Sequence, residues 1–302
     1  MQAAQSILSD GVKPSGLTGV KNIIAVSSGK GGVGKSCLTV NLASSLRKSN
    51  LKVGVFDADI SGPSIPFMMG TEDFTPTMNE DHLISPATTD DGILVSSMGM
   101  IVPPEQALAW RGPILSSAVN QLLNDTAWGD LDVLLVDCPP GTGDAQLSLG
   151  QSEKLSGAVV VTTPHRIACL DARRGIELLM EMGVPVLGLV ENMATIMCDE
   201  CGHKQEMVKE VSLEKGEVSG ARVDTLSKET GVPLLGQIDY LPELAALADR
   251  GVTAVRALHM LSDKDHSKAL KDKISKVVES YDIVAGKVRK NLKGFEDMFS
   301  TK

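Results

Sequence analysis

The sequence predicts an α/β fold with a single doubly wound, mostly parallel sheet. Short apolar runs rich in valine and isoleucine recur along the 302 residues, with helical patterns between them. Continuous apolar strands that alternate with helices indicate a parallel sheet covered on both faces. No Pro/Gly/Ser linker divides the series, so one domain is the simplest account. The predicted strands are NIIAVS (22–27), LKVGVFD (51–57), LDVLLVD (131–137), GAVVVTT (157–163), PVLGLVEN (185–192) and PLLGQI (233–238).

The chain is divided into an N-terminal extension (1–16), the α/β domain (17–260) and a tail (261–302). The tail carries one apolar stripe with steps of three and four residues, which predicts a long amphipathic helix. A helix lying on its own domain is favoured over a membrane or partner helix, because such stripes usually face a core. The stripe consists of Leu270, Ile274, Val277, Tyr281, Val284, Val288, Leu292 and Phe295.

A phosphate-binding loop follows the first predicted strand. The stretch GKGGVGKS fits G-x-x-x-x-G-K-[ST] between a strand and a helix, which indicates a P-loop NTPase domain that binds ATP. Backbone N–H groups of the loop and of the helix N-terminus face the phosphates. Lys35 is expected to neutralise the β and γ oxygens, and Ser36 to offer its hydroxyl to Mg²⁺. The nucleotide-binding residues are Gly29, Lys30, Gly31, Gly32, Val33, Gly34, Lys35 and Ser36.

Carboxylates end two of the predicted strands. Asp137 ends the 131–137 run, the expected place for the residue that holds the water shell of Mg²⁺. Asp57 and Asp59 lie at the end of the second predicted strand, and both are expected to polarise an attacking water. Any one of them could be a helix-capping carboxylate instead. Their shared location at strand carboxyl ends favours function, because ligands bind there in such sheets.

Two cysteines in MCDECGH, Cys198 and Cys201, form a CxxC pair. Two thiolates are half of the ligand set that zinc or an iron–sulfur cluster takes. Spacing alone leaves zinc, a cluster, a redox pair and unliganded thiols open. We expect the other three cysteines, Cys37, Cys138 and Cys169, to be buried structural thiols. Nearby, His203 is expected to be a turn or solvent-facing residue, and Met193 and Met197 are expected to be packing residues.

Several motifs together resemble the Mrp/ApbC-type (NUBPL-like) group of deviant-Walker P-loop ATPases, in the superfamily of MinD and ParA. They are GKGGVGKS with lysine in second position, DADISGPSIP, WRGP, VDCPPGTGDAQLSL, TTP, and VENM followed by the CxxC, between about Gly19 and Gly251. That group comprises iron–sulfur cluster carriers and assembly scaffolds. The resemblance implies a homodimer in which Lys30 reaches into the ATP site of the partner subunit. It also implies catalytic roles for Lys30, Lys35 and Asp59, which orients the attacking water.

The resemblance further implies that Asn192 contacts the edge of the adenine, although capping the turn after its strand is an alternative. For Cys198 and Cys201 it implies a 4Fe-4S cluster bridged between two subunits, with zinc, a redox pair and unliganded thiols as the alternatives. The chain departs from the group where Cys37 replaces a threonine and where VSLEKGEVSGARVD replaces a glycine-rich segment.

Charge and composition restrict the partners. A net charge of -9 and a pI near 5.1 disfavour nucleic acids and anionic membranes. Five cysteines in a long chain suit a reducing compartment, and no signal peptide or membrane span is evident. We therefore expect a cytoplasmic protein, or a mitochondrial matrix protein if a presequence has been trimmed.

Taken together, these features predict a slow, Mg²⁺-dependent ATPase that carries a 4Fe-4S cluster to apo iron–sulfur proteins. A slow rate is expected because no arginine finger is evident, and Arg111 in WRGP has no role that the sequence supports. Two alternatives remain: a MinD/ParA-like positioning ATPase that acts by surface binding, and a zinc-clamped targeting ATPase. A heteromeric partner is also possible in place of the second copy.

Overall fold

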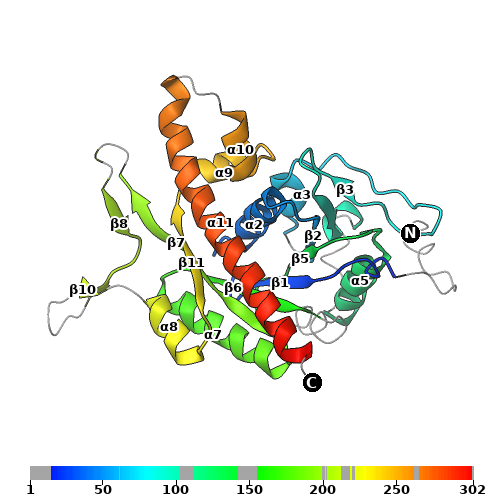
Figure 1. Ribbon diagram of the computed structural model, residues 1–302, viewed down its shortest axis with the longest axis horizontal. Helices are drawn as coiled ribbons and strands as arrows, with labels where there is room; N and C mark the ends of the chain where they lie inside the picture. The colour runs from blue at the N-terminus through cyan, green and yellow to red at the C-terminus, as the bar shows by residue number, and fades with distance from the viewer. Residues whose placement is uncertain are drawn as a thin grey trace.

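The computed structural model describes residues 15–60, 62–102, 112–141, 155–198, 201, 203–211, 218–219, 222–261 and 265–300. Arg111, Gly143 and residues 1–14 of the N-terminal extension lie outside these residues. Figure 1 shows the whole arrangement, with a central sheet, helices on both sides and one long C-terminal helix.

The described residues form one nine-stranded sheet in the order β11-β7-β6-β1-β5-β2-β4-β3, and β8 pairs with β7 outside that row. All six predicted strands are confirmed, as β1, β2, β5, β6, β7 and β11. The sheet strands are β1 (Ile23–Ser28), β2 (Val53–Asp57), β3 (Ala87–Thr88), β4 (Leu94–Ser97), β5 (Val133–Asp137), β6 (Gly157–Thr162), β7 (Val186–Met197), β8 (Lys204–Glu206) and β11 (Leu234–Tyr240).

Short strands were not anticipated. β3, β4, β8 and a separate two-stranded pair, β9 (Glu210–Val211) with β10 (Val218–Ser219), have only two to four residues each. Such segments are too short to carry a recognisable apolar run. β8 is also wholly exposed and polar, so nothing in its composition indicates a strand.

The order of the strands places the carboxyl ends of β1, β2 and β5 side by side. β1 pairs in parallel with β5 on one side and with β6 on the other, and the chain continues outward in both directions. A crevice forms at the carboxyl ends of the strands where the order reverses in this way. Val26 of β1 and Asp57 of β2 both lie in register with Asp137 of β5. The ends of these three strands therefore meet beside the loop that follows β1.

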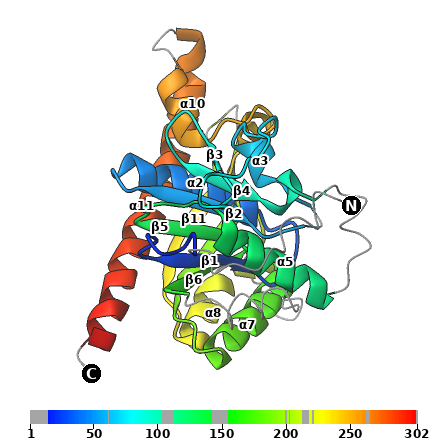
Figure 2. The ribbon, with the colours of Figure 1, turned by 90° about the vertical axis from the view of Figure 1, so that its right-hand side faces the viewer.

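Two layers of helices cover the sheet (Figure 2). The core on one face includes side chains of α5 (Gly112–Asp125), α7 (Arg166–Glu181) and α8 (Arg222–Thr230). The other face is covered by α2 (Lys35–Lys48), α3 (Ile65–Met68) and α11 (Asp265–Ser300). The remaining helices are η1 (Met98–Met100), α9 (Pro242–Ala248) and α10 (Ala254–Met260). The helices pack on the faces of the sheet, and the carboxyl ends of the strands lie at its edge, where the P-loop is.

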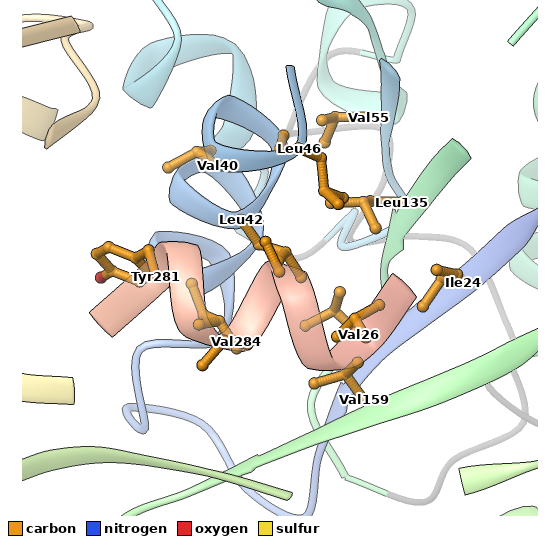
Figure 3. Close-up of a cluster of buried hydrophobic side chains, with 14 of the residues drawn as sticks. Ile24, Val26, Val40, Leu42, Leu46, Val55, Leu135, Val159, Tyr281 and Val284 are labelled. Atoms are coloured by element: carbon orange, nitrogen blue, oxygen red, sulfur yellow. The ribbon is translucent and has the colours of Figure 1, made fainter. Parts of the chain in front are cut away.

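Helix α11, orange to red in Figure 1, packs along α2 and β11. The predicted stripe faces this core: six of its members are buried, namely Ile274, Val277, Tyr281, Val284, Val288 and Leu292. Leu270 is partly buried, and the side chain of Phe295 lies outside the description. Figure 3 shows Tyr281 and Val284 among residues of α2 and the sheet. The expectation that this helix lies on its own domain is confirmed.

Among the described residues, no helix combines the length and the apolar composition needed to cross a membrane.

Candidate functional site

The P-loop lies between β1 and α2, as its sequence context requires. Gly32 and Gly34 have φ angles of 78° and 81°, a left-handed conformation that glycine adopts without steric cost. Helix α2 begins at Lys35, so its N-terminus faces the loop. Unpaired N–H groups at a helix N-terminus attract anions, so this turn is suited to a phosphate.

At two positions of the loop, neighbouring atoms lie so close that a residue larger than glycine would clash. A Cβ atom at Gly29 would lie 2.2 Å from the main-chain carbon of Asp171 in α7. A Cβ atom at Gly34 would lie 2.2 Å from Nδ2 of Asn192 in β7. At Gly31 and Gly32, by contrast, a Cβ atom would meet nothing within 4 Å. The loop is thus clamped at both ends and open along its middle.

Asp137 gathers three side chains from the first turns of α2. Its Oδ2 lies 2.5 Å from Nζ of Lys35 and accepts a 2.6 Å hydrogen bond from the Ser36 hydroxyl. Its Oδ1 accepts a 2.6 Å hydrogen bond from the Thr39 hydroxyl. Asp137 is fully buried, and Lys35 is 7% exposed. The lysine, hydroxyl and carboxylate expected to act on phosphate and Mg²⁺ therefore lie together.

Asp57 is buried and holds the backbone of the segment that follows β2, whereas from the sequence we expected it to act on an attacking water. Its carboxylate is fully buried and accepts hydrogen bonds from three backbone N–H groups and from Ser97 Oγ. The N–H donors belong to Asp59, Ser64 and Ile65, and they fix the loop that follows β2. Burial, followed by the nearby charge of Asp137, raises the pKa of Asp57 to about 7.

Asp59 and Lys30 lie at the rim of this site. Both are half-buried, and the N–H of Asp59 is held by Asp57 at 3.1 Å. The carbonyl oxygen of Lys30 accepts a hydrogen bond from Ser28 Oγ. Lys30 takes part in none of the ion pairs found within the described parts of the chain.

Asn192 lies against the P-loop itself. Its side-chain amide donates a 2.8 Å hydrogen bond to the carbonyl oxygen of Val33, and the residue is 7% exposed. The neighbouring Met193 has a φ angle of 56°, which is rare for a residue with a long side chain. The strand that carries the VENM motif is therefore attached directly to the loop.

The CxxC pair lies at the end of a β-hairpin. The last three residues of β7 pair with β8 in antiparallel register, and the N–H of Cys198 donates to the carbonyl oxygen of His203. Cys198 and Cys201 are both exposed. The hairpin lies at one edge of the molecule (Figure 1). His203 is exposed, as expected for a turn residue.

The base of this hairpin is fastened to β11. Asp239 accepts a 2.6 Å hydrogen bond from the Thr195 hydroxyl and forms a 2.5 Å ion pair with Lys204. Thr195 belongs to β7 and Lys204 to β8, so one carboxylate contacts both strands of the hairpin.

The other three cysteines occupy interior positions. Cys138 and Cys169 are buried as expected, whereas Cys37 is only half-buried, with its Sγ 4.0 Å from the Tyr281 hydroxyl. Burial raises the pKa of all three thiols, that of Cys138 to about 12. A thiol with a raised pKa is a poor metal ligand, because the ligand is the thiolate. The exposed pair is therefore the better candidate for metal.

Within the described part of one chain, no three His, Cys, Asp or Glu residues gather as a metal site.

Five residues that hold the site together were not identified from the sequence. Thr39 follows Lys35 by four residues, on the same helix face, and this spacing was a usable signal. Ser97, Thr195, Lys204 and Asp239 have no motif, because the fold alone brings them to their partners.

Comparison with known protein families gives one match over most of the chain. The sequence model of the ParA family described as "NUBPL iron-transfer P-loop NTPase" matches residues 19–278.

Named relatives are similar over four-fifths of the chain. The "Iron-sulfur cluster carrier protein" of Escherichia coli (strain K12) is 46% identical over 240 residues, which cover 80% of this chain and 62% of the relative. The chain therefore spans less than two-thirds of that relative's length. The "Iron-sulfur protein required for NADH dehydrogenase, mitochondrial" of Arabidopsis thaliana is also 46% identical over 240 residues, covering 79% of this chain and 73% of the relative.

Solved structures share the fold. A nucleotide-binding protein from Archaeoglobus fulgidus in complex with ADP is 34% identical, with a TM-score of 0.66 over 78% of this chain and 88% of that chain. The cell division ATPase MinD of Pyrococcus furiosus is 21% identical, with a TM-score of 0.61 over 89% and 98% of the two chains. The second similarity concerns the fold alone.

Proposed function

This chain belongs to the ParA family of P-loop NTPases, in the group described as NUBPL iron-transfer P-loop NTPases, and we propose that it is an ATPase that carries an iron–sulfur cluster to apoproteins. One observation carries the proposal: an exposed pair of cysteines lies at the end of β7, the strand whose Asn192 is hydrogen-bonded to the P-loop. A nucleotide site and a thiolate site that share a strand suit a carrier whose cargo depends on ATP.

The P-loop side is assigned to ATP and magnesium. Lys35 neutralises the β and γ phosphate oxygens, and Asp59 orients the attacking water. Ser36 and Asp137 offer a hydroxyl and a carboxylate oxygen, which are the donors that Mg²⁺ prefers. When bound, magnesium neutralises charge on the β and γ phosphates. Asn192 is proposed to contact the adenine in addition to Val33. Turnover is proposed to be slow.

A second copy of the chain is proposed to complete both sites. A 4Fe-4S cluster takes four thiolates, and Cys198 and Cys201 supply two. The first turns of α7 lie beside Gly29 of the P-loop, and there Ile167 and Leu170 are 67% and 49% exposed. These two exposed apolar residues, on the helix that contacts Gly29, suit a partner subunit, toward whose ATP site Lys30 would reach.

Cluster transfer tests this function. Protein reconstituted anaerobically with iron and sulfide is incubated with an apo 4Fe-4S enzyme, and recovery of that enzyme's activity is followed with and without Mg-ATP. We expect transfer from the wild type and none from the Cys198→Ala/Cys201→Ala variant. Full transfer by that variant would contradict the assignment.

A mixed dimer tests whether the cluster is shared. Wild-type and Cys198→Ala/Cys201→Ala chains with different affinity tags are co-expressed, and the mixed dimer is isolated through both tags. Because it has only two of the four thiolates, it is expected to hold no stable cluster. A mixed dimer that retains half of the wild-type iron would instead indicate a site complete within each chain.

A further inference from the structure

Strand β7 contacts the P-loop through Asn192 and ends next to the cysteine pair. Asn192 contacts Val33 of the loop, and Cys198 follows directly after the last residue of the same strand. Between them the pairing with β11 is irregular. Ile238 is paired with Asn192 and Tyr240 with Ile196, so four steps along β7 correspond to two along β11. Two extra residues on β7 interrupt the ladder, as in a β-bulge, and we call residues 192–196 the β7 bulge.

We propose that the β7 bulge couples the nucleotide state of the P-loop to the stability of the cluster held by Cys198 and Cys201. The inference rests on the proposed function and adds the residues that connect its two sites: Met193 within the bulge and Asp239 opposite it. Both act as positioning residues, because neither touches the reacting groups.

The loop end of this connection is tightly packed. A Cβ atom at Gly34 would lie 2.2 Å from Nδ2 of Asn192 and 3.6 Å from Cε of Met193. Asn192 also holds the carbonyl oxygen of Val33. Since interiors are close-packed, a change in the backbone at 33–34 displaces the start of the bulge.

The bulge is held in an unfavourable backbone conformation. Met193 has a φ angle of 56°, a left-handed conformation that is sterically unfavourable for a residue with a side chain. Such a residue stays there only while its surroundings fix it, and such strain is found at switch regions. Release of Asn192 from Val33 removes one of the contacts that fix it.

The hairpin end is held by Asp239, which lies on β11 between the two paired residues that flank the bulge. Its carboxylate accepts from Thr195, inside the bulge, and pairs with Lys204 of β8. Lys204 is in register with Met197, the residue before Cys198. A shift of the bulge therefore changes the contacts that fix the hairpin next to the first cysteine.

The test measures how strongly bound nucleotide changes the rate of cluster loss. Reconstituted protein is mixed with an iron chelator, and the rate of cluster loss is recorded with a non-hydrolysable ATP analogue and without nucleotide. The ratio of the two rates is the coupling factor. For the wild type we expect a factor of about five or more. If the analogue also changes the equilibrium affinity for the cluster, cluster loading changes the affinity for the analogue by the same factor, because reciprocity holds for binding free energies and not for rates.

Two variants act on the connection, and one serves as a matched control. Met193→Gly removes the strain, and Asp239→Asn weakens the hold on Lys204. Both are expected to bring the coupling factor to within about two-fold of one, while cluster content and analogue affinity without cluster stay within about two-fold of wild type. Asp282→Asn removes a similar ion pair with Lys48, on α11 and α2, and is expected to keep the wild-type factor.

The outcomes separate the inference from the function it rests on. A wild type that binds a cluster but has a coupling factor of one overturns the inference and leaves the carrier function standing. Met193→Gly and Asp239→Asn variants that keep the wild-type factor overturn it too. A wild type that binds no cluster at all overturns the proposed function itself.

Discussion

The side-chain amide of Asn192 lies 2.8 Å from the carbonyl oxygen of Val33, although the two residues are 159 positions apart in the sequence. This hydrogen bond joins the central P-loop strand-turn-helix unit to a strand two places along the sheet. It fixes the loop from outside its own segment, so it affects both the stability of the loop and its affinity for phosphate.

Replacement of Asn192 by alanine is expected to lower the free energy of unfolding by about 1–3 kcal/mol, because a buried carbonyl oxygen loses its partner. Affinity for ATP is expected to fall as well, as measured by calorimetry. Asn22→Ala serves as the control, since Asn22 also donates to a backbone carbonyl but lies far from the loop. Equal effects of both variants on ATP affinity would contradict a specific role for Asn192.

The Lys35–Asp137 pair predicts a non-additive double mutant. Lys35→Met leaves a fully buried carboxylate without its cation, which is expected to cost about 3–5 kcal/mol of stability in the absence of nucleotide. Asp137→Asn in the same chain removes the unpaired charge and is expected to restore part of that loss. Chemical denaturation of the four proteins of the cycle measures the coupling, and strictly additive losses would contradict it.

The pKa of Asp57 predicts how stability varies with pH. In the folded chain this pKa is raised from 3.8 to about 7, so between these values the folded protein holds a proton that the unfolded chain has lost. The free energy of unfolding should therefore fall as pH rises from about 4 to about 7, by on the order of 4 kcal/mol from this group.

Asp57→Asn removes the titration and keeps one oxygen, which at the Oδ2 position accepts the N–H groups of Ser64 and Ile65, so the stability of the variant is expected to vary less with pH over that range. Denaturation is measured without nucleotide or magnesium at several pH values. Identical slopes for the variant and the wild type would show that Asp57 is not the group responsible.

Two adjacent residues of α11 test the packing of the tail. Val284 is fully buried, whereas Ile283 is 55% exposed. Val284→Asp buries an unpaired charge and is expected to destabilise the protein by at least about 3 kcal/mol, while Ile283→Asp stays within about 0.5 kcal/mol. Similar stabilities for the two variants would mean that α11 does not pack on the core in solution.

Local patterns in the sequence predicted much of this fold and part of its site. The P-loop motif is contiguous. The apolar runs of β1, β2, β5 and β6 are strands buried at every position, because the sheet is covered on both faces there. The stripe from Ile274 to Leu292 likewise faces the core, as its spacing predicts.

Such local patterns could not predict contacts between residues that are far apart in the sequence. The sequence indicates that Asp57 ends a strand, but it does not indicate that three N–H donors from residues 59–65 and the Ser97 hydroxyl of β4 surround its carboxylate. Asp239 meets Thr195 and Lys204 only because β11 pairs with β7. No periodicity encodes these approaches, since they depend on strand order.

The metal content of protein isolated without oxygen tests the central claim most directly. Iron, acid-labile sulfide and zinc are measured per chain in the wild type and in the Cys198→Ala/Cys201→Ala variant. A 4Fe-4S cluster shared by two chains predicts about two iron and two sulfide per chain in the wild type and none in the variant. Zinc in place of iron in the wild type, or iron and sulfide retained by the variant, would contradict the account.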